Sequence, residues 1–272
     1  MKIIIFGLGS IGQRHAQNLR ALRLGYQLIY ADPKGFPADG SAAYFDWRIA
    51  LREHADADAA IIASPTDRHL EQMIALSDLG IAFYCDKPLM TVAQYNVLNY
   101  ARLSPRSCVG HQYRFWLSPE RLAYWRKMRE LEFFAHDDLI VKYGPTCMET
   151  MGSHSLDLAL YVFGPAKQVM LETDGLYLRG YIAHESGQVS SYDLRIDGQA
   201  DTSNWERPYI AAHSEWESNY SFVNMTNQAY LDAMEAWLAW LVGGERDPRT
   251  ATLEDGLRVM EVMAQCKIVK GA

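Results

Sequence analysis

The sequence predicts an α/β domain with a parallel sheet over residues 1–117, followed by an α+β domain with an open, mainly antiparallel sheet over residues 118–272. Three observations predict this division. Short apolar runs alternate with helix-like segments in the first part, which is typical of parallel strands joined by helical crossovers. A glycine-rich motif separates the first run from the first helix. In the second part, a hairpin signal joins two strand-like runs.

The composition is that of a globular protein. The 272 residues are 49% hydrophobic and 22% charged, with a formal net charge of −7. A nucleic-acid groove and an anionic membrane surface are therefore unexpected partners, and no stretch reaches the roughly 18 apolar residues of a membrane span. The cysteines lie far apart and form no C-x-x-C pair, which predicts reduced thiols and a cytoplasmic location. They are Cys85, Cys108, Cys147 and Cys266.

The first predicted strand leads into a glycine-rich turn. Residues 2–6 read KIIIF, an apolar run typical of a strand buried on both faces, and residues 7–12 match G-x-G-x-x-G. Glycines allow a tight turn and a close approach to a pyrophosphate, which the N-terminus of the helix over 13–24 then attracts. The predicted cofactor contacts in this turn are Gly7, Gly9, Ser10, Ile11 and Gly12.

An acidic residue follows the second predicted strand, residues 26–31. Asp32 lies 20 residues past Gly12, where a carboxylate accepts hydrogen bonds from an adenosine ribose and repels a 2′-phosphate. The segment therefore predicts a dinucleotide-binding Rossmann domain that prefers NAD to NADP. The alternative is a glycine-rich turn in another α/β protein, such as a methyltransferase.

A second strand–helix–strand unit follows. Residues 56–64 and 81–85 read as buried strands around a helix over 70–80, which forms a right-handed parallel crossover. Thr66 or Asp67 is expected to cap this helix. Ligands of such sheets lie beyond the carboxyl ends of the strands. The further cofactor contacts predicted at that edge are Ser64, Pro65, Thr66, Asp86 and Lys87.

Four runs of sequence together resemble the Gfo/Idh/MocA oxidoreductases, which are NAD(P)-dependent sugar and cyclitol dehydrogenases. They are GLGSIGQRHAQNL at 7–19, AAIIASPTDRHLEQMIALSDLGIAFYCDKPL at 59–89, VGHQYRF at 109–115 and MGSHSLDLALYVFG at 151–164. Residues 226–266 look like the closing pair of helices of the family. The family usually has Glu-Lys-Pro where this chain has Asp86-Lys87-Pro88, a shortening by one methylene that keeps the charge.

The resemblance implies two catalytic residues, Lys87 and His154. The lysine would hold the substrate oxygen and stabilise its negative charge, and a neutral imidazole suits removal of an alcohol proton as hydride leaves the carbon. The family places an aspartate four residues before the histidine. Thr150 stands there in this chain, and Glu149 could substitute only if the turn is irregular. A histidine that only caps the helix is the structural alternative.

Two further features surround this histidine. Asp157 lies three residues after His154, but no third ligand has suitable spacing. No metal site is therefore predicted, and Asp157 is expected on the helix surface. The crossing between the domains is expected in residues 110–116. One of Gln112, Tyr113 and Arg114 is expected to face the cleft.

The second domain is predicted to be shorter than is usual for the family. The predicted helices are 119–131 and 153–164, with closing helices from residue 228. The predicted strands are 137–143, 167–173, 176–184 and 188–196, with further extended segments in 207–213 and 219–223. Residues 185–187 read Glu-Ser-Gly and predict a hairpin between the last two long strands.

These observations predict an NAD(H)-dependent oxidoreductase that transfers a hydride between nicotinamide and a hydroxyl or keto carbon of a sugar, nucleotide sugar or cyclitol. The alternatives are an NAD-binding sensor or partner subunit without turnover, and a reductase of a non-sugar substrate.

Aromatic and polar residues mix in 204–209 and 214–220, as on sugar-binding surfaces and subunit interfaces alike. An apolar sheet face in the second domain predicts a homodimer or homotetramer.

Overall fold

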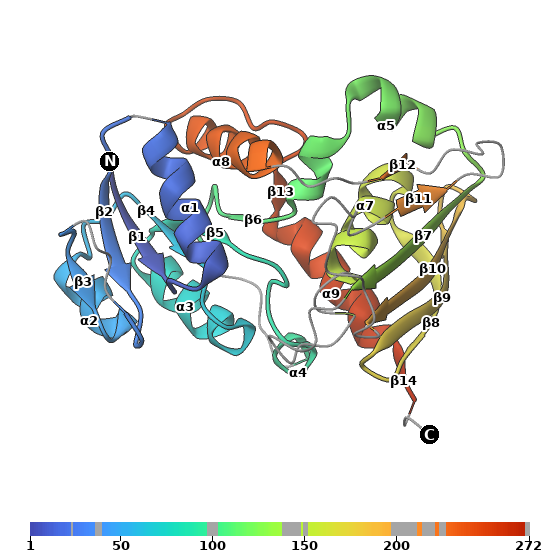
Figure 1. Ribbon diagram of the computed structural model, residues 1–272, viewed down its shortest axis with the longest axis horizontal. Coiled ribbons are helices and arrows are strands. Elements are labelled where there is room, and N and C mark those ends of the chain that lie inside the picture. The colour runs from blue at the N-terminus through green and yellow to red at the C-terminus, as the bar shows by residue number, and fades with distance from the viewer. Residues whose placement is uncertain are drawn as a thin grey trace. The chain divides into compact units, whose positions relative to one another are not determined.

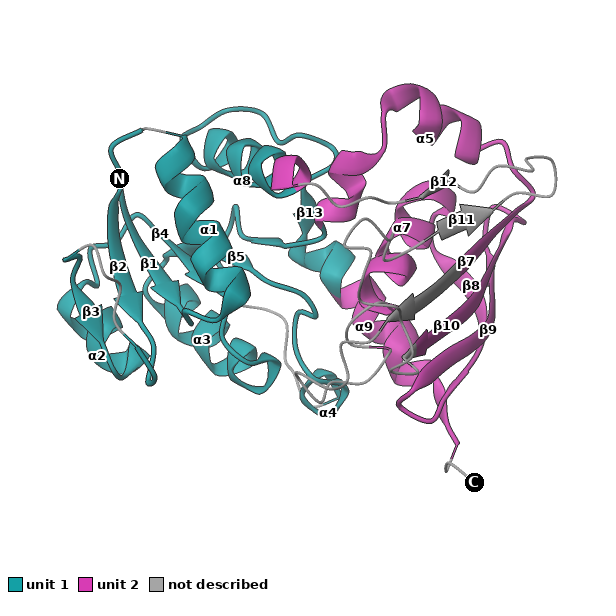
Figure 2. Cartoon of the chain, viewed as in Figure 1, with its two compact units in different colours: residues 1–111, 230–256 teal, residues 112–229, 257–272 magenta. Residues whose placement is uncertain are grey.

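The chain divides into two compact units, which are coloured separately in Figure 2. One unit combines Met1–His111 with Tyr230–Gly256, and the other combines Gln112–Ala229 with Leu257–Ala272. The computed structural model describes residues 1–22, 24–35, 40–96, 103–137, 148, 152–196, 211–213, 221–222 and 227–269.

The first unit contains a seven-stranded sheet in the order β13-β6-β5-β4-β1-β2-β3 (Figure 1). Its strands are β1 (Lys2–Phe6), β2 (Gln27–Ala31), β3 (Ala43–Tyr44), β4 (Ala59–Ile62), β5 (Ala82–Cys85), β6 (Cys108–Val109) and β13 (Ala251–Thr252). Every pairing is parallel except that of β13 with β6. The interior strand β1 is fully buried from Ile3 to Phe6, because helices cover both faces of a parallel sheet.

Helices α1 (Ser10–Ala21) and α8 (Asn227–Leu241) cover one face of this sheet, where Leu19 and Trp237 share a core cluster with Ile3 and Ile5. Successive side chains of a strand point to opposite faces. On the other face, Phe6 meets the Trp47 ring at 5.6 Å between centroids. Helices α2 (Trp47–Glu53) and α3 (Thr66–Asp78) lie on that side, and α4 (Val92–Tyr95) follows β5 (Figure 1).

The closing segment of the chain completes the first unit, which differs from the predicted division into 1–117 and 118–272. Met234 and Trp237 of α8 are fully buried in the core of the first unit. The Trp237 indole also donates a hydrogen bond to the Arg106 carbonyl at 3.0 Å, and β13 extends the sheet beside β6. Burial of these side chains therefore assigns Tyr230–Gly256 to the first unit.

The second unit contains a sheet in the order β12-β11-β7-β10-β9-β8-β14. Its strands are β7 (Glu130–Asp137), β8 (Ala166–Thr173), β9 (Tyr177–His184), β10 (Val189–Ile196), β11 (Ala211–His213), β12 (Ser221–Phe222) and β14 (Lys267–Ile268). In the described parts of the chain, β7 with β10 and β8 with β14 pair parallel, and the other four pairings are antiparallel. The predicted fold class, a Rossmann domain followed by an α+β domain with a mainly antiparallel sheet, is confirmed.

The helical segments of the second unit are η1 (Gln112–Trp116), a 3₁₀ helix, α5 (Pro119–Trp125), α7 (Ser153–Phe163) and α9 (Leu253–Gln265), which begins in the first unit. Helix α7 lies against the sheet, where Phe163 contacts the His184 ring of β9 at 5.3 Å between centroids. It ends at Gly164, whose φ of +83° suits glycine, so the predicted stop is confirmed. The predicted hairpin is also confirmed, with Gly187 at a φ of +87°.

One boundary was predicted wrongly. The helix expected over 119–131 ends at Trp125, and strand β7 already begins at Glu130. Leu131 and Phe133 are buried, and their spacing of two is that of a strand with one face in the core. Pairing with β10 along this stretch overrides the helical pattern. The strand predicted over 137–143 lies largely outside the described residues.

Candidate functional site

Two positions in the turn after β1 must be glycine, because the neighbouring backbone leaves no room for a Cβ atom. Gly7 has a φ of +92°, and a Cβ atom there would lie 2.5 Å from the Ala63 carbonyl oxygen. A Cβ atom on Gly12 would lie 2.0 Å from the Gly7 carbonyl oxygen. Larger residues at either position would push β1 and α1 out of contact with each other and with β4.

Gly9 has a different reason to be glycine. Its φ of −63° is accessible to any residue, and apart from its two chain neighbours no described residue has an atom within 4 Å of the position its Cβ would take. The open space lies at the start of α1, whose first two residues are Ser10 and Ile11 and which has no side-chain cap among the described residues. Uncapped N–H groups at a helix start attract anions. The turn therefore fits a pyrophosphate that approaches the Gly9 backbone closely.

Asp32 is fixed beside this turn. Its Oδ2 accepts the Leu8 N–H at 2.6 Å and its Oδ1 accepts the Lys34 N–H at 2.6 Å. A carboxylate oxygen can accept more than one hydrogen bond, so both oxygens can also accept from a ribose hydroxyl. The position after β2, next to the glycine turn, fits the ribose-binding role predicted for Asp32.

The predicted contacts Ser64, Pro65 and Thr66 follow β4 directly. The Ser64 hydroxyl donates to the Gln72 side-chain oxygen at 2.6 Å, so this contact within the unit orients the hydroxyl. Helix α3 begins at Thr66, with Pro65 at the N-cap position and no side-chain cap among the described residues. The prediction that Thr66 or Asp67 caps the helix is therefore wrong, because both are already in its first turn.

His69 joins this loop to the one that carries Lys87. The imidazole is buried, with Nε2 at 2.8 Å from the Ser64 carbonyl oxygen and Nδ1 at 3.0 Å from the Pro88 carbonyl oxygen. Burial, the largest influence, lowers the pKa of His69 despite these carbonyls. The neutral ring has one N–H, so it donates to one carbonyl at a time. Sequence analysis overlooked His69, which lies in the first turn of α3.

Asp86 and Lys87 follow β5, and the Lys87–Pro88 peptide bond is cis. His15 of α1 is fully buried, with Nε2 at 3.9 Å from the Asp86 Oδ1. Burial is the largest influence on Asp86 and opposes its ionisation, but attraction to His15, Lys87 and His69 lowers the pKa of Asp86 below its ordinary value. The residue before Lys87 is therefore a carboxylate at neutral pH, as the glutamate usual in the family would be.

These residues share one edge of the sheet. The register pairs Phe6 at the end of β1 with Ala31 on one side and with Ile62 on the other, and Ile62 pairs with Cys85. The glycine turn, Asp32, the Ser64 loop and Lys87 therefore all follow strands that end side by side, as predicted.

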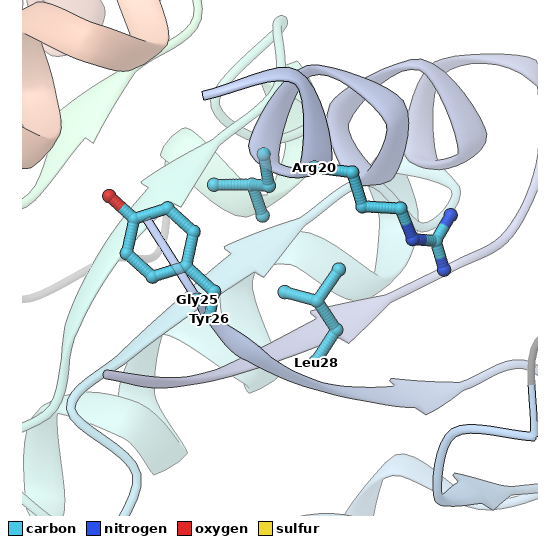
Figure 3. A pocket seen from close by; sticks show the side chains of 5 residues that line it. Arg20, Gly25, Tyr26 and Leu28 are labelled. Atoms are coloured by element: carbon cyan, nitrogen blue, oxygen red, sulfur yellow. The ribbon is translucent and has the colours of Figure 1, made fainter. Parts of the chain in front are cut away.

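Figure 3 shows a hollow elsewhere on the first unit. It measures about 320 Å³ and is lined by Leu19, Arg20, Gly25, Tyr26 and Leu28. These residues lie where α1 ends and β2 begins, which is the edge opposite the carboxyl ends of the strands. The hollow includes none of the predicted cofactor contacts.

In the second unit, the predicted His154 is the second residue of α7 and is buried. The Tyr113 ring stacks on its imidazole, with 4.0 Å between centroids and an interplanar angle of 2°. Glu149 and Thr150, the two candidate partners of His154, lie outside the described residues.

Asp157 is buried rather than on the helix surface, so that expectation was wrong. The Arg114 guanidinium donates to both carboxylate oxygens, from Nη2 at 2.6 Å and from Nε at 2.9 Å. The two side chains are 3% and 1% exposed. Gln112, Tyr113 and Arg114 are all buried. Tyr113 contacts His154, and Arg114 pairs with Asp157. The sequence alone could not show which of these residues makes which contact.

The described residues contain no group of three or more His, Cys, Asp or Glu side chains placed to hold a metal ion. In the same residues, no helix has the length and apolar character needed to cross a membrane.

Known proteins resemble the N-terminal part of the chain in sequence. Residues 1–102 match the sequence model of the oxidoreductase family with an NAD-binding Rossmann fold. A curated inositol 2-dehydrogenase from Paracoccus denitrificans is 29% identical over 102 residues, which cover 35% of this chain and 30% of that protein. The match thus spans less than a third of the curated relative.

Solved structures resemble the whole chain in fold. The WlbA dehydrogenase from Bordetella pertussis, in complex with NADH and UDP-GlcNAcA, has a TM-score of 0.76 and 14% identity, covering 97% of this chain and 94% of that one. The WlbA (WbpB) dehydrogenase from Thermus thermophilus, with NAD and UDP-GlcNAcA, has a TM-score of 0.73 and 17% identity over 100% and 97%. A myo-inositol dehydrogenase from Corynebacterium glutamicum has a TM-score of 0.69 and 18% identity over 96% and 94%.

The predicted family resemblance and the predicted NAD cofactor agree with these matches. The agreement has a structural reason. The glycine turn and Asp32 follow strands that end side by side at one edge of the sheet. Over residues 1–102 this chain is therefore similar to the Gfo/Idh/MocA oxidoreductases, a family with an NAD-binding Rossmann fold.

Proposed function

We propose that this protein is an NAD(H)-dependent oxidoreductase that acts on a hydroxyl or keto carbon of a sugar, nucleotide sugar or cyclitol. The observation that carries the proposal is the open space at Gly9, at the uncapped start of α1 and beside the fixed carboxylate of Asp32. The substrate class is supported by the curated inositol 2-dehydrogenase and by the solved dehydrogenases that hold nucleotide sugars.

The cofactor would be held by residues at the strand ends of the first unit. The glycine turn and the first turn of α1 would bind the pyrophosphate, and Asp32 would accept hydrogen bonds from the adenosine ribose. Ser64, Pro65, Thr66 and Asp86 would line the path toward Lys87. The bound nicotinamide supplies hydride transfer to or from the substrate carbon.

Lys87 and His154 would carry the proton and charge chemistry. In the oxidation direction His154 would accept the hydroxyl proton as hydride leaves the same carbon, so that the alcohol becomes a carbonyl. Lys87 would donate a hydrogen bond to that oxygen and stabilise its negative charge. The two residues belong to different units, and their action on one substrate is part of this proposal.

The test is an absorbance assay of the purified protein with NADH and a panel of keto-sugars, keto-cyclitols and their nucleotide-linked forms. Loss of NADH absorbance with at least one member supports the proposal. Tight NADH binding without oxidation by any member would instead favour a cofactor-binding sensor or partner subunit, which is the alternative raised by the Thr150 substitution.

The first prediction is a preference for NAD(H) over NADP(H). The carboxylate of Asp32 would repel a 2′-phosphate while it accepts from the ribose hydroxyls, so calorimetry should give a Kd for NADH at least several-fold below that for NADPH. Equal or tighter binding of NADPH would contradict the assigned role of Asp32 and would point to Lys34 as a phosphate partner.

A matched pair of glycine variants tests the proposed pyrophosphate contact. Gly9→Ser should raise the Kd for NADH about tenfold or more, a loss near 1.4 kcal/mol, and leave Tm unchanged, because its Cβ meets no described residue and serine is a favoured N-cap. Gly12→Ala should lower the free energy of unfolding by about 1–3 kcal/mol, because its Cβ overlaps the Gly7 carbonyl. A Gly9→Ser variant that binds NADH normally would place the pyrophosphate elsewhere.

Self-association is proposed for the second unit. On the sheet face opposite α7, Met170 of β8 pairs in register with Tyr181 of β9, and both are exposed, at 52% and 41%. Such an exposed apolar pair favours association, so light scattering at micromolar concentration should give a dimer or tetramer of the 30.9 kDa chain. Tyr181→Glu should shift the mass toward the monomer, whereas a monomeric wild-type protein would contradict the proposal.

A further inference from the structure

One face of the His154 imidazole is covered by an aromatic ring. The Tyr113 and His154 rings are nearly parallel, at 2°, with centroids 4.0 Å apart, and each residue is 5% exposed. Parallel rings at this distance are in van der Waals contact across their faces. The imidazole therefore cannot tilt toward Tyr113, and its chemistry is confined to its edge and its other face.

The residue after Tyr113 is anchored independently. Arg114 forms the buried pair with Asp157, which lies three residues after His154 and thus on a neighbouring part of the same helix face. The Arg114 guanidinium also lies over the Tyr161 ring, 4.6 Å from its centroid. Segment η1 is thus fixed to α7 at consecutive residues, so the backbone that carries Tyr113 is held in place relative to His154.

We propose that Tyr113 is a positioning residue for His154: its phenol ring fixes the plane of the imidazole and stabilises the imidazolium that forms when His154 accepts the substrate proton. The inference rests on the proposed function. Proton transfer is sensitive to small errors in the direction of the accepting nitrogen, and the face of a tyrosine ring attracts a cation. Both effects act in the chemical step rather than in substrate binding.

Two variants separate the ring from its hydroxyl. Tyr113→Phe keeps the stacked ring and should retain kcat within about twofold, whereas Tyr113→Leu removes it and should lower kcat by about tenfold, with KM changed much less, as for partial loss of general acid–base catalysis. Equal losses of kcat in both variants would overturn the proposal, because they would assign the effect to the hydroxyl. Full kcat in Tyr113→Leu would overturn it as well.

A second readout is independent of turnover. In the wild-type protein, NMR should show a nuclear Overhauser cross-peak between the Tyr113 and His154 ring protons, with the His154 signals shifted upfield by the stacked ring and assigned with His154→Gln. The upfield shift should persist in Tyr113→Phe and disappear in Tyr113→Leu. Persistence of the shift in folded Tyr113→Leu overturns the stacking.

The two readouts also separate this proposal from the proposed function. A wild-type protein that oxidises NADH with none of the panel contradicts the proposed function and, with it, the positioning role of Tyr113 in that reaction. A wild-type protein that turns over normally, together with an equally active Tyr113→Leu, contradicts only the positioning role.

Discussion

Replacing Lys87 with alanine is expected to lower kcat/KM by roughly two to three orders of magnitude, as for the loss of one well-placed donor to a developing negative charge. The Kd for NADH should change far less, because the glycine turn and Asp32 are proposed to supply most of that binding. Steady-state kinetics on a verified substrate and calorimetry with NADH measure the two effects separately. His154→Ala should lower turnover by about 10² or more, since it removes the proposed proton acceptor.

Lys34→Ala is a suitable control for Lys87→Ala. Lys34 is exposed and follows Asp32 by two residues, so its loss removes the same charge from the same unit. The Lys34→Ala variant should have nearly the kcat/KM of the wild-type protein. Full activity in both Lys87→Ala and His154→Ala would show that the proposed chemistry is wrong.

Replacing Asp157 with asparagine is expected to lower the free energy of unfolding by about 3–5 kcal/mol, because it leaves the Arg114 guanidinium buried without its counter-charge. Urea denaturation should show this as a lower midpoint with an unchanged slope. The double variant Arg114→Met with Asp157→Leu should recover much of the loss, since apolar side chains of similar volume can replace a buried ion pair.

The second unit contains an exposed carboxylate for comparison. The Asp193 Oδ1 lies 3.2 Å from the Arg179 Nε and 3.1 Å from the Arg195 Nε, and the three side chains are 42–44% exposed. Solvent screening limits each such ion pair to about 0–1 kcal/mol, so Asp193→Asn should cost much less than Asp157→Asn. Similar costs for Asp157→Asn and Asp193→Asn would mean that burial does not set the contribution of the Arg114–Asp157 pair.

The edge of the sheet that is proposed to bind the cofactor could be located from the sequence because its signals are local. Strand, glycine turn and helix follow one another within residues 2–21, and Asp32 has a fixed spacing from Gly12. The parallel order of strands then places the Ser64 loop and Lys87 at the same edge without any knowledge of side-chain contacts.

The second unit was harder to predict because its decisive contacts join distant residues. Arg114 and Asp157 are separated by 43 positions, and nothing in the spacing of either residue indicates burial. The start of β7 depends on its partner β10, more than 50 residues later, so the local helical pattern extended too far. Helix α8 has an apolar face that could pack on either unit, and only its contacts with Ile3 and Ile5 decide between them.

The assignment of Tyr230–Gly256 to the first unit has a consequence for how the chain acquires its structure. The core around Ile3 and Ile5 includes Trp237, and the sheet gains β13 only at Ala251. During synthesis from the N-terminus, a ribosome must therefore translate most of the second unit before the nucleotide-binding core can close. Contacts between such distant residues slow folding, because a long loop must be ordered first. The part of this core that α8 covers consequently stays exposed until the residues of α8 have been made, and exposed apolar surface of this kind favours aggregation and chaperone binding.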